Sequence, residues 1–309
     1  MLISMLLGLI SGLSIFFVAI LIMSKTISRA ADYQFKKWVS IFTTNPIMGI
    51  FVGGVVTAIT HSSSGTTVMV VSLVNSGVMN LYQATAVIMG ANIGSTFTAQ
   101  LISFNFYNVI PHLLFIGVLF YYLNFHPAMK QLGKFMIGFC LLFVGIQIMS
   151  QSMDPLKHMS SFQNLMISIE DQSFKGILVG LITTAIIQSS STGVAILQSL
   201  SFQGLINLAQ ALPILLGQNI GTCITTIMAS FAVDKNGKRA AIIHLLFNIS
   251  GVVLLYPFLD SFSQFVSQLT PLNPMRQIAN AHTIFNVLNT LILIPFISQL
   301  VWISQKIIR

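Results

Sequence analysis

The stretch Thr60–Thr67 reads THSSSGTT and interrupts an apolar segment, residues 47–76, at its centre. A second apolar segment, residues 176–201, is interrupted in the same way by QSSSTG at Gln188–Gly193. Small polar residues at mid-span are costly in hydrocarbon unless they line a cavity or pack against protein. Each stretch therefore indicates a helix that is broken inside a membrane.

The composition is that of a membrane protein. The 309 residues include 14 Lys and Arg against 6 Asp and Glu, so 6% are charged, whereas a soluble domain carries about a quarter. Hydrophobic residues make up 55%, and the mean hydropathy is +0.87. These values exclude a disordered chain and argue against a soluble globule. In a membrane protein the net charge of +8 is the expected cytoplasmic Lys/Arg excess, so no nucleic-acid partner is expected.

Nine charge-poor segments are candidates for the membrane. They cover residues 2–24, 47–76, 84–104, 108–123, 132–150, 176–201, 209–231, 240–258 and 281–304. The first lacks a basic n-region and a clear cleavage site, so we expect an uncleaved helix. The predicted fold is an all-α polytopic membrane protein with about seven full spans, in which the two interrupted segments form re-entrant helical hairpins.

The charges leave open whether each interrupted segment is a hairpin or one broken spanning helix. The arms beside each break have about 10 residues, or ~15 Å as helix, which is enough to reach the midplane and return. Both arrangements place 11 Lys and Arg on one side of the membrane and 3 on the other. The positive-inside rule therefore predicts an outer N-terminus and a cytoplasmic C-terminus in the cytoplasmic membrane under either arrangement.

The chain contains a duplicated unit. Shifting the sequence by 127 residues aligns 51–104 with 178–231 without a gap, and 22 of 54 positions are identical. The matches include both serine triplets and two Asn-Ile-Gly elements, which begin at Asn92 and Asn219. Hairpins would give inverted repeats, and broken spanning helices would give parallel ones. Because inverted repeats with discontinuous helices are a common plan of secondary transporters, we favour hairpins.

The predicted organisation is a single membrane transport domain over residues 1–309. Its parts are repeat 1, a linking span with an outer loop, repeat 2 and a C-terminal span, at approximately 45–124, 132–175, 176–258 and 281–304.

The chemistry of the breaks favours an anion. A helix restarts after each serine triplet, and its first turn carries unpaired N–H groups and the positive end of the helix dipole. Two such ends meeting at the midplane would form a site for a small tetrahedral oxyanion. All six acidic residues are expected in loops: Asp32, Asp154, Glu170, Asp171, Asp234 and Asp260. The site would therefore not repel an anion, and a coupling cation would need neutral oxygen ligands.

The Asn-Ile-Gly elements supply such oxygens. Helical spacing places three polar side chains of each element on one face, namely Asn92, Ser95 and Thr98, and Asn219, Thr222 and Thr225. Small polar residues at this spacing also pack membrane helices together, which is the alternative. Their occurrence in two matched copies, each following a serine triplet, favours the functional interpretation.

A second motif, Ala-x-x-His-x-x-Phe-Asn, occurs twice at a spacing of 38 residues and contains His244 and His282. Histidines inside a membrane are candidates for function, here gating or the substrate path. The spacing also suits hydrogen bonds between helices, so a structural role is the alternative.

The run Gln188-Ser189-Ser190-Ser191, in a duplicated unit with Asn-Ile-Gly-Thr downstream, resembles the type II sodium-dependent phosphate cotransporter family over residues 45–300. The resemblance implies symport of inorganic phosphate driven by sodium through alternating access, with sodium as the coupling ion and no other cofactor. It implies that the phosphate site includes Ser62, Ser63, Ser64, Asn92, Gln188, Ser189, Ser190, Ser191 and Asn219. The implied sodium ligands are Gln188, Ser189, Thr222 and Thr225, with Ser95 and Thr98 as their first-repeat counterparts.

Two departures from the family pattern matter. The family has glutamine before the serines in both repeats, but the first copy here has His61. A titratable ring would make transport depend on pH near about 6–7, and it leaves open whether sodium or protons drive transport. The alternative is that the ring stays neutral and forms the hydrogen bonds that an amide would form. Many bacterial relatives also carry a PhoU-like helical domain after the membrane part. Since this sequence shows none up to Arg309, we expect any such regulator to be a separate partner.

Other functions remain as alternatives: a transporter of another oxyanion, an anion channel or efflux path, and a sensor or scaffold without transport. An enzyme is not expected, because the sequence shows no nucleophile–base–acid set, metal cluster or nucleotide loop. Stoichiometry, electrogenicity, direction and oligomeric state do not follow from the sequence.

Overall fold

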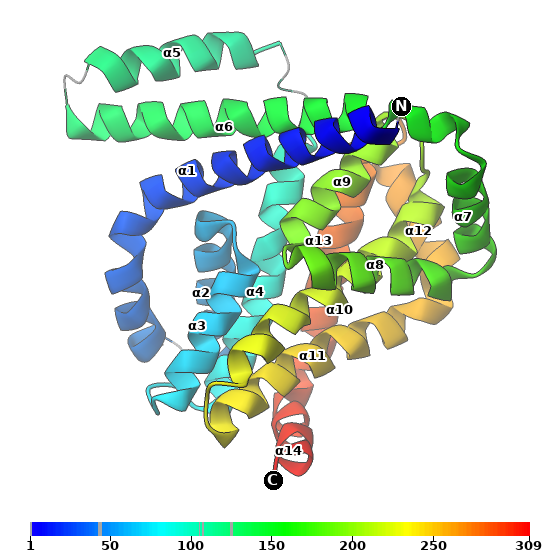
Figure 1. Cartoon of the computed structure of the whole chain (residues 1–309). Coiled ribbons are helices and arrows are strands. Elements are labelled where there is room, and N and C mark those ends of the chain that lie inside the picture. The colour runs from blue at the N-terminus through cyan, green and yellow to red at the C-terminus, as the bar shows by residue number, and fades with distance from the viewer. Residues whose placement is uncertain (1, 43–44, 105, 107, 124–125) are drawn as a thin grey trace.

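The computed structural model describes residues 2–42, 45–104, 106, 108–123 and 126–309, with the backbone alone for residues 2 and 27–42. Within these ranges all regular structure is helical (Figure 1). The α-helices are α1 (Leu2–Phe42), α2 (Pro46–Thr60), α3 (Ser63–Asn75), α4 (Leu81–Ile102), α5 (Ile110–Leu123), α6 (Pro127–Ser152), α7 (Ser160–Asp171), α8 (Ser173–Ile187), α9 (Ser190–Phe202), α10 (Leu208–Ser230), α11 (Lys235–Leu255), α12 (Leu259–Leu269), α13 (Pro274–Leu293) and α14 (Ile297–Ile307). Three short 3₁₀ helices are η1 (Asp154–His158), η2 (Tyr256–Phe258) and η3 (Ile294–Phe296).

Five helical segments are long and apolar enough to cross a membrane, which agrees with the predicted all-α membrane class. They are Ile3–Thr26, Pro127–His158, Leu208–Ser230, Lys235–Leu269 and Pro274–Ile307.

Two of the seven expected spans do not meet the same criteria. The segment 84–104 forms most of α4, a helix buried along most of its length, so protein contacts replace lipid-facing apolar side chains. The segment 108–123 forms α5, whose 14 residues would reach only ~21 Å against a hydrocarbon core of about 30 Å.

The acidic residues lie mostly in helices, so the expectation that all six lie in loops is wrong. Asp154 begins η1, Glu170 and Asp171 end α7, and Asp260 lies in the first turn of α12. Asp234 alone among the described acidic side chains lies outside a helix, at the N-cap of α11. For Asp32, in α1, the side chain falls outside the described residues.

The duplicated sequence folds into two triplets of helices with the same local geometry. The first arms, α2 and α8, have 15 residues each, and the second arms, α3 and α9, have 13 each, longer than the arms expected from the sequence. The third helices, α4 and α10, begin at capping boxes, in which Asn80 pairs with Gln83 and Asn207 with Gln210. Matched sequences therefore give matched starts, lengths and ends.

The chain reverses its direction at the first serine break. The helices α2 and α4 run parallel, because Gly49 lies against Ala86 and, one and a half turns later, Gly54 lies against Gly94. Since α3 connects these two parallel helices, it must lead the chain back toward the start of α2. A helix that continued through the break would instead have left α4 antiparallel to α2.

The second triplet repeats this arrangement. Gly176 lies against Pro213, and Gly221 lies against Leu181, so α8 and α10 are parallel and α9 leads the chain back. Both breaks are therefore tight turns between two antiparallel arms.

The open ends of the two hairpins lie at opposite ends of α10. Its start lies beside the beginning of α8, through the contact between Gly176 and Pro213. Directly beyond its other end, the N–H of Asp234 donates to Asn75 Oδ1 at the end of α3, at 2.7 Å. The hairpins therefore approach each other from opposite directions.

The two triplets interlock through their second arms. The hydroxyls of Thr67 in α3 and Thr226 in α10 lie 2.8 Å apart, and Gln198 in α9 donates to the carbonyl of Ala99 in α4 at 3.0 Å. Helix α11 packs against both α10 and α3, and α13 packs against both α4 and α9. The remaining long helices, α1 and α6, lie side by side, and α5 packs on α6 at one edge (Figure 1).

Gly53→Ala tests the backbone contact between α2 and α4. A Cβ on Gly53 would clash with the carbonyl oxygen of Val87, so we expect a loss of about 1–3 kcal/mol of stability. Gly54→Ala is the matched control, because its Cβ would lie 3.5 Å from Gly90 O, an ordinary contact. Thermal unfolding of the purified chain in detergent measures both. Equal stability of the two variants would contradict the close crossing.

Candidate functional site

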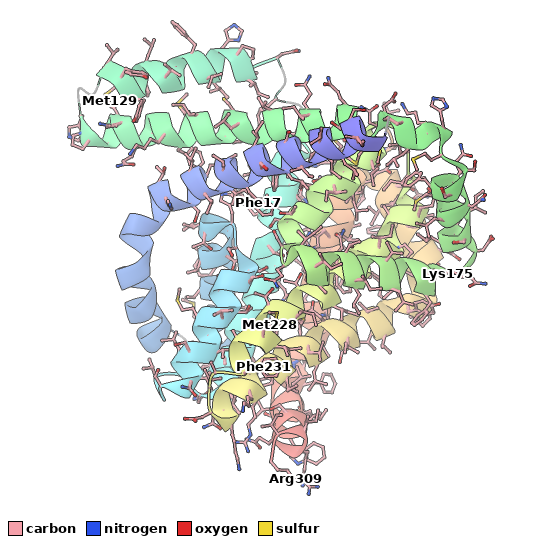
Figure 2. The ribbon with its side chains drawn as sticks, viewed as in Figure 1. Phe17, Met129, Lys175, Met228, Phe231 and Arg309 are labelled. Atoms are coloured by element: carbon pink, nitrogen blue, oxygen red, sulfur yellow. The ribbon has the colours of Figure 1, made fainter. Side chains whose placement is uncertain are left out.

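The two serine breaks line one cavity of about 340 Å³. Its walls come from both hairpin tips and from one face of α1: Thr60, His61, Ser62, Ser63, Ser64, Gln188, Ser189, Ser190 and Ser191, with Phe17, Ile20, Leu21 and Ser24. Among the described residues that line it, none is Asp, Glu, Lys or Arg. Phe17 marks the α1 side in Figure 2. All six serines predicted to bind phosphate, together with Gln188, thus lie around a single space.

The tips touch directly and present helix starts to the cavity. The hydroxyl of Ser64 donates to the carbonyl of Gln188 at 3.4 Å. The first serine of each triplet is an N-cap: Ser62 Oγ accepts from Gly65 N at 3.0 Å, and Ser189 Oγ accepts from Thr192 N at 3.3 Å. The other first-turn N–H groups of α3 and α9 have no intrahelical partner, so two positive helix ends face the same uncharged space.

The residue before each triplet has a left-handed backbone. His61 and Gln188 have φ of 53° and 58°, and they are the only non-glycine residues with positive φ in the described ranges. This conformation costs an L-residue roughly 1–2 kcal/mol and recurs at functional sites. It also ends the first arm and redirects the chain into the N-cap serine. The sequence pattern located the breaks but carried no sign of this conformation.

In the first repeat the polar groups near the tip satisfy each other. His61 Nδ1 lies 3.0 Å from Thr98 Oγ1, and the hydroxyl of Thr57 donates to Thr66 Oγ1 at 2.9 Å. The hydroxyls of Thr57, Thr66 and Thr98 therefore each have a hydrogen-bond partner.

In the second repeat the equivalent oxygens are free. Gln188, in place of His61, donates weakly to the sulfur of Met228 at 3.6 Å and leaves Thr225, the counterpart of Thr98, without a partner among the described residues. Thr184 is the counterpart of Thr57, but the position of Thr66 is taken by Gly193, so the buried Thr184 hydroxyl is likewise unpaired there. The matched sequences therefore differ in their free oxygens.

The sequence analysis missed two residues beside this second tip, Thr184 in α8 and Gln218 in α10. The Gln218 Nε2 lies 2.9 Å from where a Cβ on Gly193 would be, and the Thr184 hydroxyl lies 3.2 Å from the same point. The Gln218 side chain is 3% exposed, and its Oε1 has no partner in the described part of the chain. The signal was present in the repeat, because Gln218 stands where the first copy has Ala91.

The Asn-Ile-Gly side chains do not line the cavity. Asn92 and Asn219 each donate to a carbonyl of their own helix, at 2.9 and 3.0 Å. The hydroxyls of Ser95 and Thr222 do the same, at 2.7 and 2.8 Å. These four residues are buried within α4 and α10, where such bonds are also typical of helix packing.

Of the three candidate histidines, only His61 lines the cavity. His244 Nδ1 lies 3.0 Å from Thr226 Oγ1, which itself contacts Thr67, so this histidine joins α11 to α10 and α3. His282 is 1% exposed, and neither ring nitrogen has a hydrogen-bond partner among the described residues.

Comparison with known proteins identifies the family. The family model described as Na+/Pi-cotransporter matches the chain twice, at residues 15–151 and 152–289. The "Uncharacterized protein YqeW" of Bacillus subtilis (strain 168) is 35% identical over 87% of this chain and 88% of its own length. No solved structure matches.

Two further relatives have descriptive names. The "Putative inorganic phosphate export protein YjbB" of Escherichia coli (strain K12) is 27% identical over 70% of this chain and 40% of its own length. The "Sodium-dependent phosphate transport protein 2B" of Homo sapiens is 43% identical over 27% of this chain and 13% of its own length. The chain thus spans less than half the length of these two relatives.

Substitutions of Gln188 test the left-handed turn separately from binding. Gln188→Val, which places a β-branched residue at φ 58°, should lower the melting temperature by about 2–4 °C. Gln188→Gly should not lower it, because glycine adopts this conformation freely. Ile187→Gly, one residue earlier inside α8, is the control and should be destabilising. Thermal unfolding in detergent ranks the melting temperatures of the three variants. An equal fall of the melting temperature in Gln188→Gly and Gln188→Val would argue against the left-handed turn.

The double match over both halves, on a helical chain whose duplicated serine breaks meet at one cavity, shows that this chain belongs to the Na+/Pi-cotransporter family and is a multi-pass membrane protein.

Proposed function

We propose that the chain transports inorganic phosphate by sodium-coupled symport across the cytoplasmic membrane, through alternating access. The observation that carries the proposal is the single cavity at which both serine triplets and two helix N-termini meet, and whose described lining residues carry no charge. Donor groups and positive dipole ends favour a small oxyanion, and the described lining residues include no carboxylate that would repel it. The names of the sodium-dependent transport protein and the export protein support the substrate.

The membrane arrangement is part of the proposal. The two hairpins would be re-entrant and would belong to inverted repeats, supported by their approach from opposite ends of α10. Their tips would meet near the midplane, where discontinuous helices of transporters hold substrate. The Lys/Arg distribution supports an outer N-terminus and a cytoplasmic C-terminus. The two termini lie at opposite ends of the molecule in Figure 1.

Phosphate would be held by donors from both tips. The serines after each N-cap, Ser63, Ser64, Ser190 and Ser191, would donate from hydroxyls and first-turn N–H groups. Asn92 and Asn219 would act less directly, because they lie behind the cavity within α4 and α10.

We place the coupling sodium beside the second-repeat tip. Thr184, Gln218 and Thr225 hold oxygens that no described residue binds, and Gln188 and Ser189 contribute from the cavity wall. Neutral hydroxyl and amide oxygens are suitable ligands for a cation at a broken helix.

A first-repeat sodium is less favoured. An ion at Ser95 and Thr98 would have to break the hydrogen bond between Thr98 and His61. Thr222 is a further second-repeat ligand candidate, since its hydroxyl donates to the carbonyl of Gln218 and leaves oxygen lone pairs for a cation.

Export is the second candidate, and the name of the relative YjbB is what favours it. The same site serves either direction, because a symporter runs down the combined gradients of its ions. Direction therefore depends on the coupling ion and on how the cell sets its gradients.

Reconstituted vesicles test the proposal. Given an inward sodium gradient, they should accumulate labelled phosphate above its outer concentration, and potassium in place of sodium should give no accumulation. Equilibration without uphill accumulation would indicate a channel. Accumulation driven by a proton gradient but not by sodium would refute the coupling ion, and stronger competition by sulfate or arsenate than by phosphate would refute the substrate.

Thr225→Val tests the sodium site. The variant keeps the shape of the side chain but removes an oxygen with no protein partner, so the sodium concentration for half-maximal uptake should rise about tenfold. Thr183→Val is the control, because the Thr183 hydroxyl donates to Val179 O of its own exposed helix face. If both variants show parental sodium dependence, sodium does not bind at Thr225.

His61→Gln separates the two interpretations of the first-repeat histidine. If the neutral ring acts as an amide, sodium-driven uptake persists in the variant, and its pH profile between about 5.5 and 7.5 matches the parent. This is the outcome we expect, since the ring is engaged with Thr98. Loss of a proton-driven component in the variant would instead assign proton coupling to His61.

A further inference from the structure

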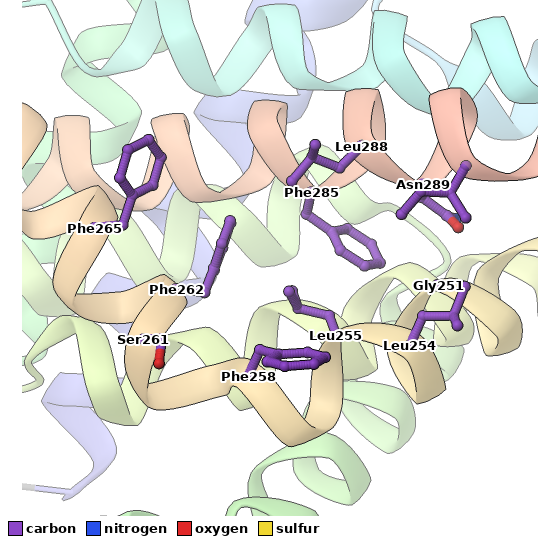
Figure 3. Close-up of a pocket in the computed structure, with 11 residues that line it drawn as sticks. Gly251, Leu254, Leu255, Phe258, Ser261, Phe262, Phe265, Phe285, Leu288 and Asn289 are labelled. Carbon is purple, nitrogen blue, oxygen red and sulfur yellow. The ribbon is translucent and has the colours of Figure 1, made fainter.

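A second cavity lies away from the serine breaks, between α11, η2, α12 and α13 (Figure 3). It has a volume of about 470 Å³, within the range of small-molecule sites, about 300–1,000 Å³. Its lining is apolar apart from two polar side chains, Ser261 and Asn289. No role in the proposed transport path accounts for it.

The mouth of this cavity opens on a surface that would face lipid. Its walls belong to the candidate membrane spans Lys235–Leu269 and Pro274–Ile307. Large apolar side chains at its rim are strongly exposed, among them Phe258 at 62%, Phe265 at 52% and Leu254 at 44%. Deeper in the cavity, Phe262 and Phe285 are only 7% and 2% exposed.

Three fillings are conceivable, and two are disfavoured. Water needs two to four polar partners for each molecule, and Ser261 and Asn289 are the only two polar side chains in the described lining of about 470 Å³. An empty space of this size would forfeit the dispersion contacts of the aromatic walls. Hydrocarbon meets neither objection, and at this depth it is the surrounding solvent.

We propose that this cavity binds one acyl chain of a bilayer lipid. The chain enters between Leu254, Phe258 and Leu288 and packs on the buried rings of Phe262 and Phe285. Its inner end reaches the joint between α11 and α13, where Asn289 covers Gly251 and donates to the carbonyl of Phe247 at 3.0 Å. Asn289 and Gly251 lie at one end of the row of lining residues in Figure 3, and Phe265 at the other.

From this position the bound acyl chain can influence the transport site through the packing of two helices. The same two helices pack on the hairpin arms, α11 on α3 and α13 on α9. An acyl chain between them stabilises one spacing of α11 and α13, and hence one arrangement of the arms that they hold.

Photolabelling tests the proposal independently of transport. The full chain is reconstituted in phosphatidylcholine vesicles that contain phosphatidylcholine with a diazirine on one acyl chain, and labelled residues are mapped by mass spectrometry. We expect label on the buried Phe262 and Phe285, which bulk lipid does not reach. Label confined to exposed residues such as Phe258 and Phe265 would overturn the proposal.

Two adjacent exposed residues of α11 provide a matched pair of variants. Leu254→Trp places bulk in the mouth and should lower the labelling of Phe262 and Phe285 about fivefold or more, equivalent to about 1 kcal/mol. Val253→Trp adds the same bulk at a residue that does not line the cavity and is 63% exposed, so labelling should stay at the parental level.

Leu288→Trp, from the α13 wall, repeats the test should Leu254→Trp fail to fold. Equal labelling in all variants would refute entry through this mouth.

Discussion

The structure depends on a two-residue reversal that occurs twice. A left-handed residue ends one helix, and an extended serine caps the next, so each apolar segment turns back with a helix N-terminus at its tip. Neither tip could stand alone in hydrocarbon, because its free N–H groups and hydroxyls would lack partners. In the fold both tips instead line one polar cavity, and across it the Ser64 hydroxyl donates to the carbonyl of Gln188.

The parallel crossings of α2 with α4 and of α8 with α10 make this meeting possible. Glycines allow backbones to touch there, as at Gly53 against Val87 and Gly180 against Ile214. Close approach replaces the hydrophobic effect, which does not drive helices together in lipid. The close approach of the two backbones also fixes the position of each hairpin tip along the third helix of its triplet. The interlocking second arms, held by α11 and α13, then set the distance between the tips.

Duplication has not kept the two halves chemically equal. Near the first tip His61 pairs with Thr98 and Thr57 with Thr66, whereas near the second tip the buried hydroxyl oxygens of Thr184 and Thr225 have no partner among the described residues. The two halves thus share one backbone arrangement, but the threonine hydroxyls near the first tip are hydrogen-bonded and their counterparts near the second tip are not, among the described residues. In the proposed symport, the anion would take donors from both tips, and the sodium ion would take the oxygens beside the second tip alone.

The sequence by itself determined the helical membrane class, the duplication, the two breaks and the serines that gather around one cavity, because charge depletion and repeated polar runs are local signals. Only the tertiary structure decided that each break is a reversal, since α2 and α4 are known to be parallel only once they are packed. Pairing across helices likewise lies beyond a local pattern. The structure shows that Thr98 is already bonded to His61, that the oxygens of Gln218 and Thr184 have no partner among the described residues, and that Asn92 and Asn219 lie behind the cavity. Whether a polar group is available to a ligand depends on which neighbour already binds it.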